Sequence, residues 1–172
     1  MSKLEVDAIE PQSGTTLTLG ASGDTVALGS GVTTSGIGKV LQVVTATDST
    51  TRNTTSVSFV TASNTLSVNI TPSSASNKIF IIVNAGGYIN ATGEADYTIY
   101  RESTNLGGSD GMTRMYNETA AQINSSIAMS YLDSPSSTSE LTYQVYLKAV
   151  SGTVYINYPN GKASITAFEI AG

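Results

Sequence analysis

The chain has 172 residues, a net charge of −5 and only 12% charged residues, and it contains neither histidine nor cysteine. This composition excludes zinc sites built from thiolate or imidazole, Ser-His-Asp triads and thiol nucleophiles, and eight scattered Lys and Arg leave no basic stripe for nucleic acid. No apolar stretch is long enough to cross a bilayer, so we expect a soluble protein. We also expect it to bind no cofactor. Ser and Thr supply 48 residues, which favours strands and turns over helices.

Residues 1–38 contain a two-copy repeat. The segment 14–20 recurs as 23–29, and each copy places two apolar residues two positions apart before a glycine. Such a short ribbon cannot hide its apolar face within itself, because two-stranded units are marginal in water. We therefore predict an extended stalk in which three chains wrap around one axis, with an interface formed by Leu17, Leu19, Val26 and Leu28.

Residues 39–172 contain strand-length segments in which apolar and polar residues alternate. Leu66, Val68 and Ile70 follow this pattern, as do the segments 141–148 and 154–158, which predicts half-buried antiparallel strands. The segment 79–83 is instead continuously apolar, which favours a strand covered on both faces, by a second sheet and by a neighbouring chain. The remaining predicted strands are 40–46, 56–61, 95–101, 126–132 and 164–170.

Turn residues separate these strands. Gly, Pro, Asn and Ser mark turns in proteins, and here they cluster at 71–74, 84–87, 107–111, 134–137, 151–152 and 159–161. Strands at roughly even spacing indicate an all-β fold, an antiparallel β-sandwich over 39–172 with a jelly roll as the leading topology. Tyr143 is expected in the core of this sandwich and Tyr146 on the opposite face.

Two motifs resemble parts of catalytic or phosphate sites. The glycines of 107–111 lack the Gly-Lys-Ser/Thr ending of a phosphate-binding loop. Glu94 and Asp96 point the same way if a strand begins there, and paired carboxylates serve glycosidases, although carboxylates at a strand entry more often discourage edge pairing. We predict that the chain is not an enzyme, with polysaccharide degradation as a distant alternative.

Several segments carry a likeness to a known family. They are residues 2–9 (Ser-Lys-Leu-Glu-Val-Asp-Ala-Ile), the repeat copies 13–20 and 23–29, and the segments 38–44, 77–83 and 165–172. The first three resemble the virion-proximal start of bacteriophage tail-fibre proteins, particularly those of marine and cyanobacterial phages, and the others are similar to the tip domains that follow such starts. The likeness covers nearly the whole chain.

The resemblance implies a homotrimeric fibre made in the host cytoplasm and exposed on the virion. The segment 1–38 would dock on neighbouring tail or capsid proteins, and 39–172 would form a jelly-roll knob. Within the family, proteins this short also serve as head fibres or capsid decoration proteins, which leaves that alternative open. The family has no catalytic motif to transfer.

If the knob adheres to host surface glycans, the segment 104–119 is the expected contact loop, because binding residues often lie on loops that a rigid scaffold positions. Multiple copies on one particle would turn weak individual contacts into strong attachment. The residues expected to make contact are Asn105, Asp110, Arg114 and Tyr116.

Overall fold

The computed structural model describes residues 24–25, 40–90, 92–158 and 161–172. The chain divides into two units, Met1–Ile37 and Gly38–Gly172. All regular structure in the described residues is β-strand, and none of their segments forms a helix long and apolar enough to cross a membrane. Outside the described residues lie the predicted stalk contacts Leu17, Leu19, Val26 and Leu28.

The described part of the second unit contains twelve strands. Every pairing between them is antiparallel, so the fold is all-β, as the sequence predicts. Their bounds are β1 Val40–Asp48, β2 Arg52–Thr54, β3 Val60–Thr61, β4 Ser67–Ile70, β5 Lys78–Ile89, β6 Gly93–Arg101, β7 Thr104–Asn105, β8 Thr113–Asn117, β9 Ile123–Asp133, β10 Leu141–Ser151, β11 Val154–Ile156 and β12 Ala163–Ile170.

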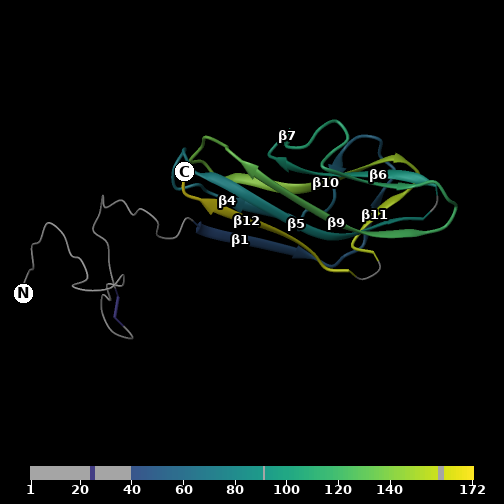
Figure 1. The fold of residues 1–172 in the computed structure, drawn as a ribbon, viewed down its shortest axis with the longest axis horizontal. Helices are drawn as coiled ribbons and strands as arrows, with labels where there is room; N and C mark the ends of the chain where they lie inside the picture. Colours follow the sequence, from purple (N-terminus) through teal and green to yellow (C-terminus); the bar gives the residue numbers. More distant parts are fainter. Residues whose placement is uncertain (1–23, 26–39, 91, 159–160) are drawn as a thin grey trace, which may run out of the picture. The chain divides into compact units, whose positions relative to one another are not determined.

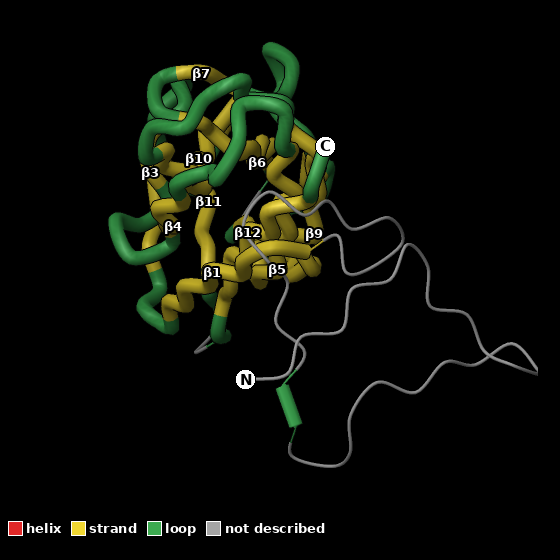
Figure 2. The backbone as a smooth tube through the Cα atoms, turned by 90° about the vertical axis from the view of Figure 1, so that its left-hand side faces the viewer, coloured by secondary structure: helices red, strands yellow, loops and turns green. Residues whose placement is uncertain are grey.

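The strands form two six-stranded sheets that lie as two layers of a sandwich-like fold (Figures 1 and 2). In the first sheet, β9 lies along one edge of the long strand β5, and β12 and β11 share its other edge; β1 extends the sheet beyond β12, and β2 extends it beyond β11. In the second sheet, β10 and β6 are central, with β4 and β3 beside β10 and β8 and β7 beside β6.

The hydrophobic core lies between the inner faces of the two sheets. Ile79, Ile81 and Val83 of β5 have no exposed surface, and neither have Tyr143 and Val145 of β10 in the same cluster. Burial of each such side chain stabilises the fold by about 1.5–3 kcal/mol. The alternation along β10 is the one that the sequence predicts. In β5, where the sequence predicts a strand covered on both faces, Ile79, Ile81 and Val83 are buried while Phe80 and Ile82 between them are only partly buried.

Most predicted strands are confirmed, with ends that differ by a few residues. The prediction over 56–61 is wrong except at its end, where Val60 and Thr61 form β3. The sequence pattern does not predict β2, β7 or β8, because these strands are short and only β8 buries an apolar side chain, that of Met115. As a result, part of the predicted contact loop 104–119 is strand.

The predicted turn at 84–87 is wrong, because β5 continues through it to Ile89. Glycine here serves close packing: a Cβ at Gly87 would lie 2.5 Å from Sδ of Met115 and 2.9 Å from two carbons of Ile127, closer than real Cβ contacts come. Glycine can mark a close approach inside a strand as well as a turn, and the sequence alone does not distinguish the two.

A buried carboxylate fixes the end of the first sheet where β1 and β12 pair. Glu169, only 1% exposed, accepts hydrogen bonds from Nε2 of Gln42 at 2.8 Å, from the backbone N–H of Ser73 at 2.6 Å and from Nδ2 of Asn77 at 2.6 Å. Burial raises the pKa of Glu169, but these hydrogen bonds outweigh that effect and lower its pKa from 4.5 to about 2. The ionised Glu169 therefore holds β1 and the turn before β5 in place.

Candidate functional site

The predicted contact residue Asn105 has a structural role. Its Oδ1 accepts hydrogen bonds from Oγ1 of Thr98 at 2.6 Å and from the backbone N–H of Gly107 at 2.9 Å, and its Nδ2 donates to the carbonyl oxygen of Gly108 at 3.0 Å. The side chain thus shapes the turn that follows β7. Both polar atoms of this amide therefore have hydrogen-bond partners within the chain.

The predicted contacts Asp110 and Arg114 belong to one charge cluster on the outer face of the second sheet. Arg114 donates from Nε to Oδ1 of Asp96 at 2.6 Å and from Nη2 to Oδ2 at 3.0 Å, and it pairs with Glu94 at 3.4 Å and Asp110 at 3.3 Å. The hydrogen bonds to Asp96 are the largest cause of the raised pKa of Arg114. The guanidinium is therefore committed to carboxylates of its own chain.

The predicted pair Glu94 and Asp96 points the same way, since Arg114 binds both. Asp96 has no exposed surface, and its Oδ2, which also accepts a hydrogen bond from Arg114, lies 3.1 Å from Nζ of Lys148. Both carboxylates are thus paired with cations of the chain, whereas a glycosidase needs two that reach substrate.

Aromatic side chains complete this outer face. Tyr146 stacks on Tyr100 with ring centroids 4.0 Å apart, Phe59 meets Tyr100 edge-on at 6.2 Å, and Nζ of Lys148 lies 4.8 Å from the centre of the Phe59 ring. Tyr146 therefore lies on the face opposite the core, as predicted. Beyond the cluster, Tyr116 is 55% exposed. With the side chain of Asp110, which is 68% exposed, it is among the more exposed of the four predicted contacts.

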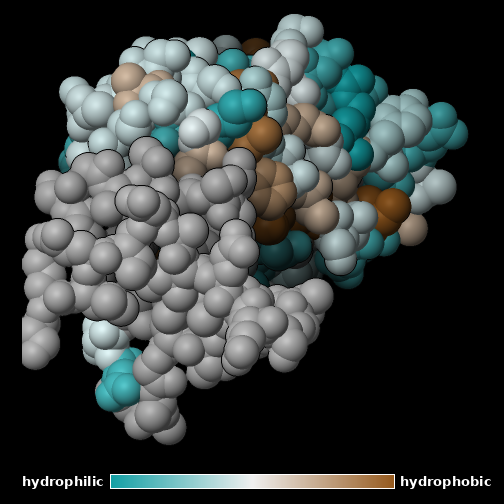
Figure 3. All heavy atoms as spheres, turned by 60° about the vertical axis from the view of Figure 1, so that its left-hand side comes forward, coloured by the Kyte–Doolittle hydropathy of each residue, from teal (hydrophilic) through white to brown (hydrophobic). Residues whose placement is uncertain are grey.

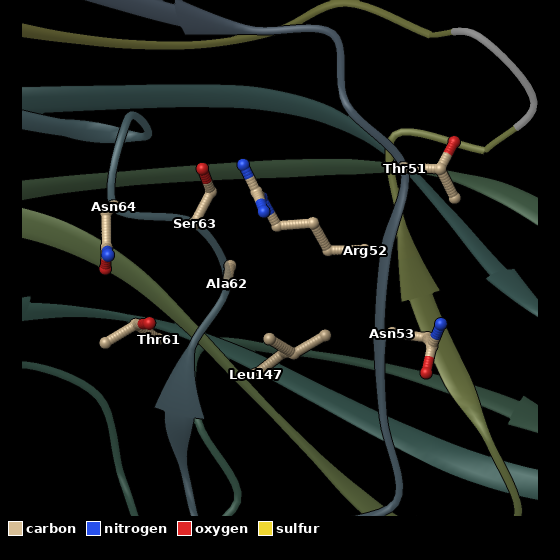
Figure 4. Close-up of a pocket in the computed structure, with 8 residues that line it drawn as sticks. All are labelled: Thr51, Arg52, Asn53, Thr61, Ala62, Ser63, Asn64 and Leu147. Atoms are coloured by element: carbon tan, nitrogen blue, oxygen red, sulfur yellow. The ribbon is translucent and has the colours of Figure 1, made fainter.

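A surface pocket that the sequence does not predict lies between β2 and the chain that follows β3 (Figure 4). Its volume is about 410 Å³, within the range of small-ligand sites. Apolar Ala62 and Leu147, both 2% exposed, form part of its lining. The other lining residues carry hydrogen-bonding side chains: Thr51, Arg52, Asn53, Thr61, Ser63 and Asn64.

Arg52 is held across this pocket by a buried carboxylate. Figure 4 shows its side chain reaching from β2 toward Ser63; its Nε donates to Oδ2 of Asp48 at 3.3 Å, and Asp48 is 7% exposed. Burial raises the pKa of Asp48, but hydrogen bonds from Ser63, the backbone of Thr50, Thr65 and Arg52 lower it well below its usual range. Asp48 thus stays ionised and fixes Arg52, whose two Nη groups have no hydrogen-bond partner in the described residues.

The lining suits a sugar better than an ion or an apolar ligand. A pyranose ring presents hydroxyl groups at its edge and C–H groups on its faces, and this pocket offers amides, hydroxyls and one guanidinium beside a small apolar floor. Among the described residues, no group of three acidic side chains is placed to hold a metal ion. The residues of this pocket come from 51–53, 61–64 and 147, so no local sequence pattern reveals it.

Comparison with known proteins identifies no family for the chain. A scan against models of protein families finds no match to the chain, and a search of curated protein sequences finds none either.

Proposed function

We propose that the chain is a homotrimeric fibre protein of a bacteriophage virion, with residues 39–172 as an exposed jelly-roll knob. The segments that resemble phage fibre proteins support this proposal, and so does the order of the strands. The eight described strands of four residues or more pair as β1-β12-β5-β9 and β4-β10-β6-β8. Numbered in chain order, these are 1-8-3-6 and 2-7-4-5, the arrangement that two interlocked Greek keys produce in a jelly roll.

The knob adheres to glycans of the host surface, and the pocket at Arg52 is the binding site. The observation that carries this proposal is the lining of the pocket, where Arg52, fixed by Asp48, stands among amides and hydroxyls over an apolar floor. A shallow pocket of this kind binds one sugar weakly, and repeated copies on a particle compensate through avidity. The glycan therefore contacts a different part of the knob from the predicted loop 104–119.

The test is binding of the fluorescently labelled full-length protein to an array of bacterial surface polysaccharides. We expect binding that falls about tenfold or more in Arg52→Ala, the effect of losing a charge-assisted hydrogen bond. Lys162→Ala, which removes an exposed cation outside the pocket lining, is the matched control and keeps wild-type binding. Wild-type protein that binds no polysaccharide, or equal binding by the two variants, contradicts the adhesion proposal.

A capsid decoration protein without a receptor role is the second candidate. Exposed apolar side chains on the outer face of the first sheet, among them Val43 at 54% and Leu132 at 50%, favour it because such surfaces pack against other proteins. Immunolabelling of intact particles separates the candidates: label on the tail supports the fibre, and label spread over the capsid, with no polysaccharide binding, supports decoration.

A further inference from the structure

A row of apolar side chains crosses the outer face of the first sheet. The register of the strands places Val43 of β1 opposite Phe168 of β12, Phe168 opposite Phe80 of β5, and Phe80 opposite Leu132 of β9. The rings of Phe80 and Phe168 lie 6.3 Å apart. We call these four residues the apolar row; its two ends, Val43 and Leu132, are 54% and 50% exposed.

Further apolar residues extend the apolar row toward the start of β1. Val40, 51% exposed, pairs with Ile170, and Leu41, 49% exposed, lies at the irregularity in register that follows Val40. On the other side of the row, Ile82 is also only half-buried. In Figure 3 the largest group of brown and tan, apolar atoms lies near the middle of the view, with smaller brown patches at the right and top, and white and teal cover most of the other coloured surface.

The side chains of the apolar row are not part of the core, because along each strand they alternate with the core residues. Ile79 and Ile81, on either side of Phe80, have no exposed surface, and the same is true of Ala167 beside Phe168. In β10, by contrast, the residues facing away from the core include Gln144 and Lys148. Strand β5 is thus apolar on both faces, which a strand needs only if both faces are covered.

At the other end of β5, side chains of the same chain cover the outer face of the first sheet. Tyr88 of β5 stacks on Tyr158 with ring centroids 4.0 Å apart and meets Tyr155 of β11 at 5.0 Å, so Tyr88 is only 3% exposed. No described residue covers the apolar row in this way. The described part of the chain therefore leaves the apolar row without a cover.

We propose that the apolar row is a contact between copies of this chain, an inference that rests on the homotrimer proposed above. The row lies at the end of the first sheet where residues 1–38 lead into β1. If the chains are joined through residues 1–38, their β1 strands lie close together. The apolar rows of the copies then lie close together as well. The row itself carries no charged residue, so identical rows meet without repulsion.

The apolar row is too small to hold copies of the chain together without the association through residues 1–38. Four strands at about 4.8 Å spacing and two or three residue pairs along them cover roughly 200 Å², whereas a free-standing interface buries about 800 Å² on each partner. The row therefore adds to an association that residues 1–38 begin, and it raises the affinity through the high effective concentration of tethered chains.

The test is the mass of the full-length protein by light scattering over a dilution series. The variant Val43→Ser with Leu132→Ser changes the two most exposed members of the row, and Val57→Ser with Val150→Ser is its control, since Val57 is 74% and Val150 40% exposed away from the row. We expect a wild-type and control trimer, and a row variant that dissociates at a concentration about tenfold or more higher. Urea unfolding verifies that each variant is folded.

The outcomes separate this inference from the proposed function. A trimer whose dissociation is the same in the row variant and the control overturns the inference alone. A wild-type monomer overturns the homotrimer and the inference together, while polysaccharide binding, measured separately, still decides adhesion. If the row variant does not fold, Phe80→Tyr, which adds only a hydroxyl to the row, replaces it with the same expected direction of change.

Discussion

The outer faces of the two sheets differ in what covers them. On the second sheet, Asp96 and Thr98 have no exposed surface, because the turn after β7, Arg114 and Lys148 lie over them. On the first sheet, Val43 and Leu132 remain about half exposed. Polar side chains let a short loop of the same chain close the second face through hydrogen bonds and ion pairs. An apolar row offers no such partners, and no described residue of the chain closes the first face there.

The largest expected effect on a single chain comes from opening the covered face. Asp96→Ala removes the carboxylate that binds both Arg114 and Lys148, and loss of one partner from a buried ion pair costs about 3 kcal/mol. We expect urea unfolding to show this loss, with Glu94→Ala, whose side chain is 26% exposed and makes one longer contact, as a nearly neutral control. Equal stability of the two variants would mean that the charge cluster is not what closes this face.

Acid weakens the end of the first sheet that presents the apolar row. Because Glu169 has a pKa lowered from 4.5 to about 2, its stabilising contribution is fully present above about pH 4.5 and is lost as the pH falls through about 2. Asp48, whose pKa is lowered too, acts in the same direction.

Glu169→Gln tests this source of pH dependence. The variant loses charge-assisted hydrogen bonds and about 2 kcal/mol of unfolding free energy at neutral pH, and its stability falls less steeply than that of the wild type between pH 4.5 and 2. Thermal unfolding at a series of pH values measures both effects. Parallel curves for the two proteins would assign the acid sensitivity to other groups.

A smaller effect is expected where aromatic contacts cover the second sheet. Phe59→Ala removes the edge contact with Tyr100 and the ring beneath Lys148, which together contribute about 1 kcal/mol. Urea unfolding measures the loss, and Val57→Ala, at an exposed neighbouring position, is the control. No difference from this control would show that Phe59 only lies on the surface and does not help to close it.

The sequence predicts the parts of this fold that depend on alternation along one strand. Tyr143 and Val145 follow a period of two and are buried as expected, because the pleat of a strand directs alternate side chains to one face. The segment 79–83 is apolar throughout, so its sequence predicts a strand but not which of its side chains face the core. Strand β8 escapes prediction because only Met115 marks its inner face.

The candidate sites were harder to predict, because they join residues far apart in the sequence. Asp96 and Arg114 are 18 positions apart and meet only because β6 pairs with β8. The pocket at Arg52 likewise depends on Leu147 of β10 lying beside β3. Glycine adds a further ambiguity: Gly87 permits close packing inside a strand, and its neighbours in sequence suggest a turn.

Cross-linking through single cysteines tests most directly whether the apolar row lies between copies of the chain. The protein contains no cysteine, so Val43→Cys and Val57→Cys each provide one thiol, the first in the row and the second on an exposed position outside it. Under mild oxidation we predict covalently joined pairs of chains from Val43→Cys and single chains from Val57→Cys. Single chains from Val43→Cys, or equal joining in both variants, would contradict the account.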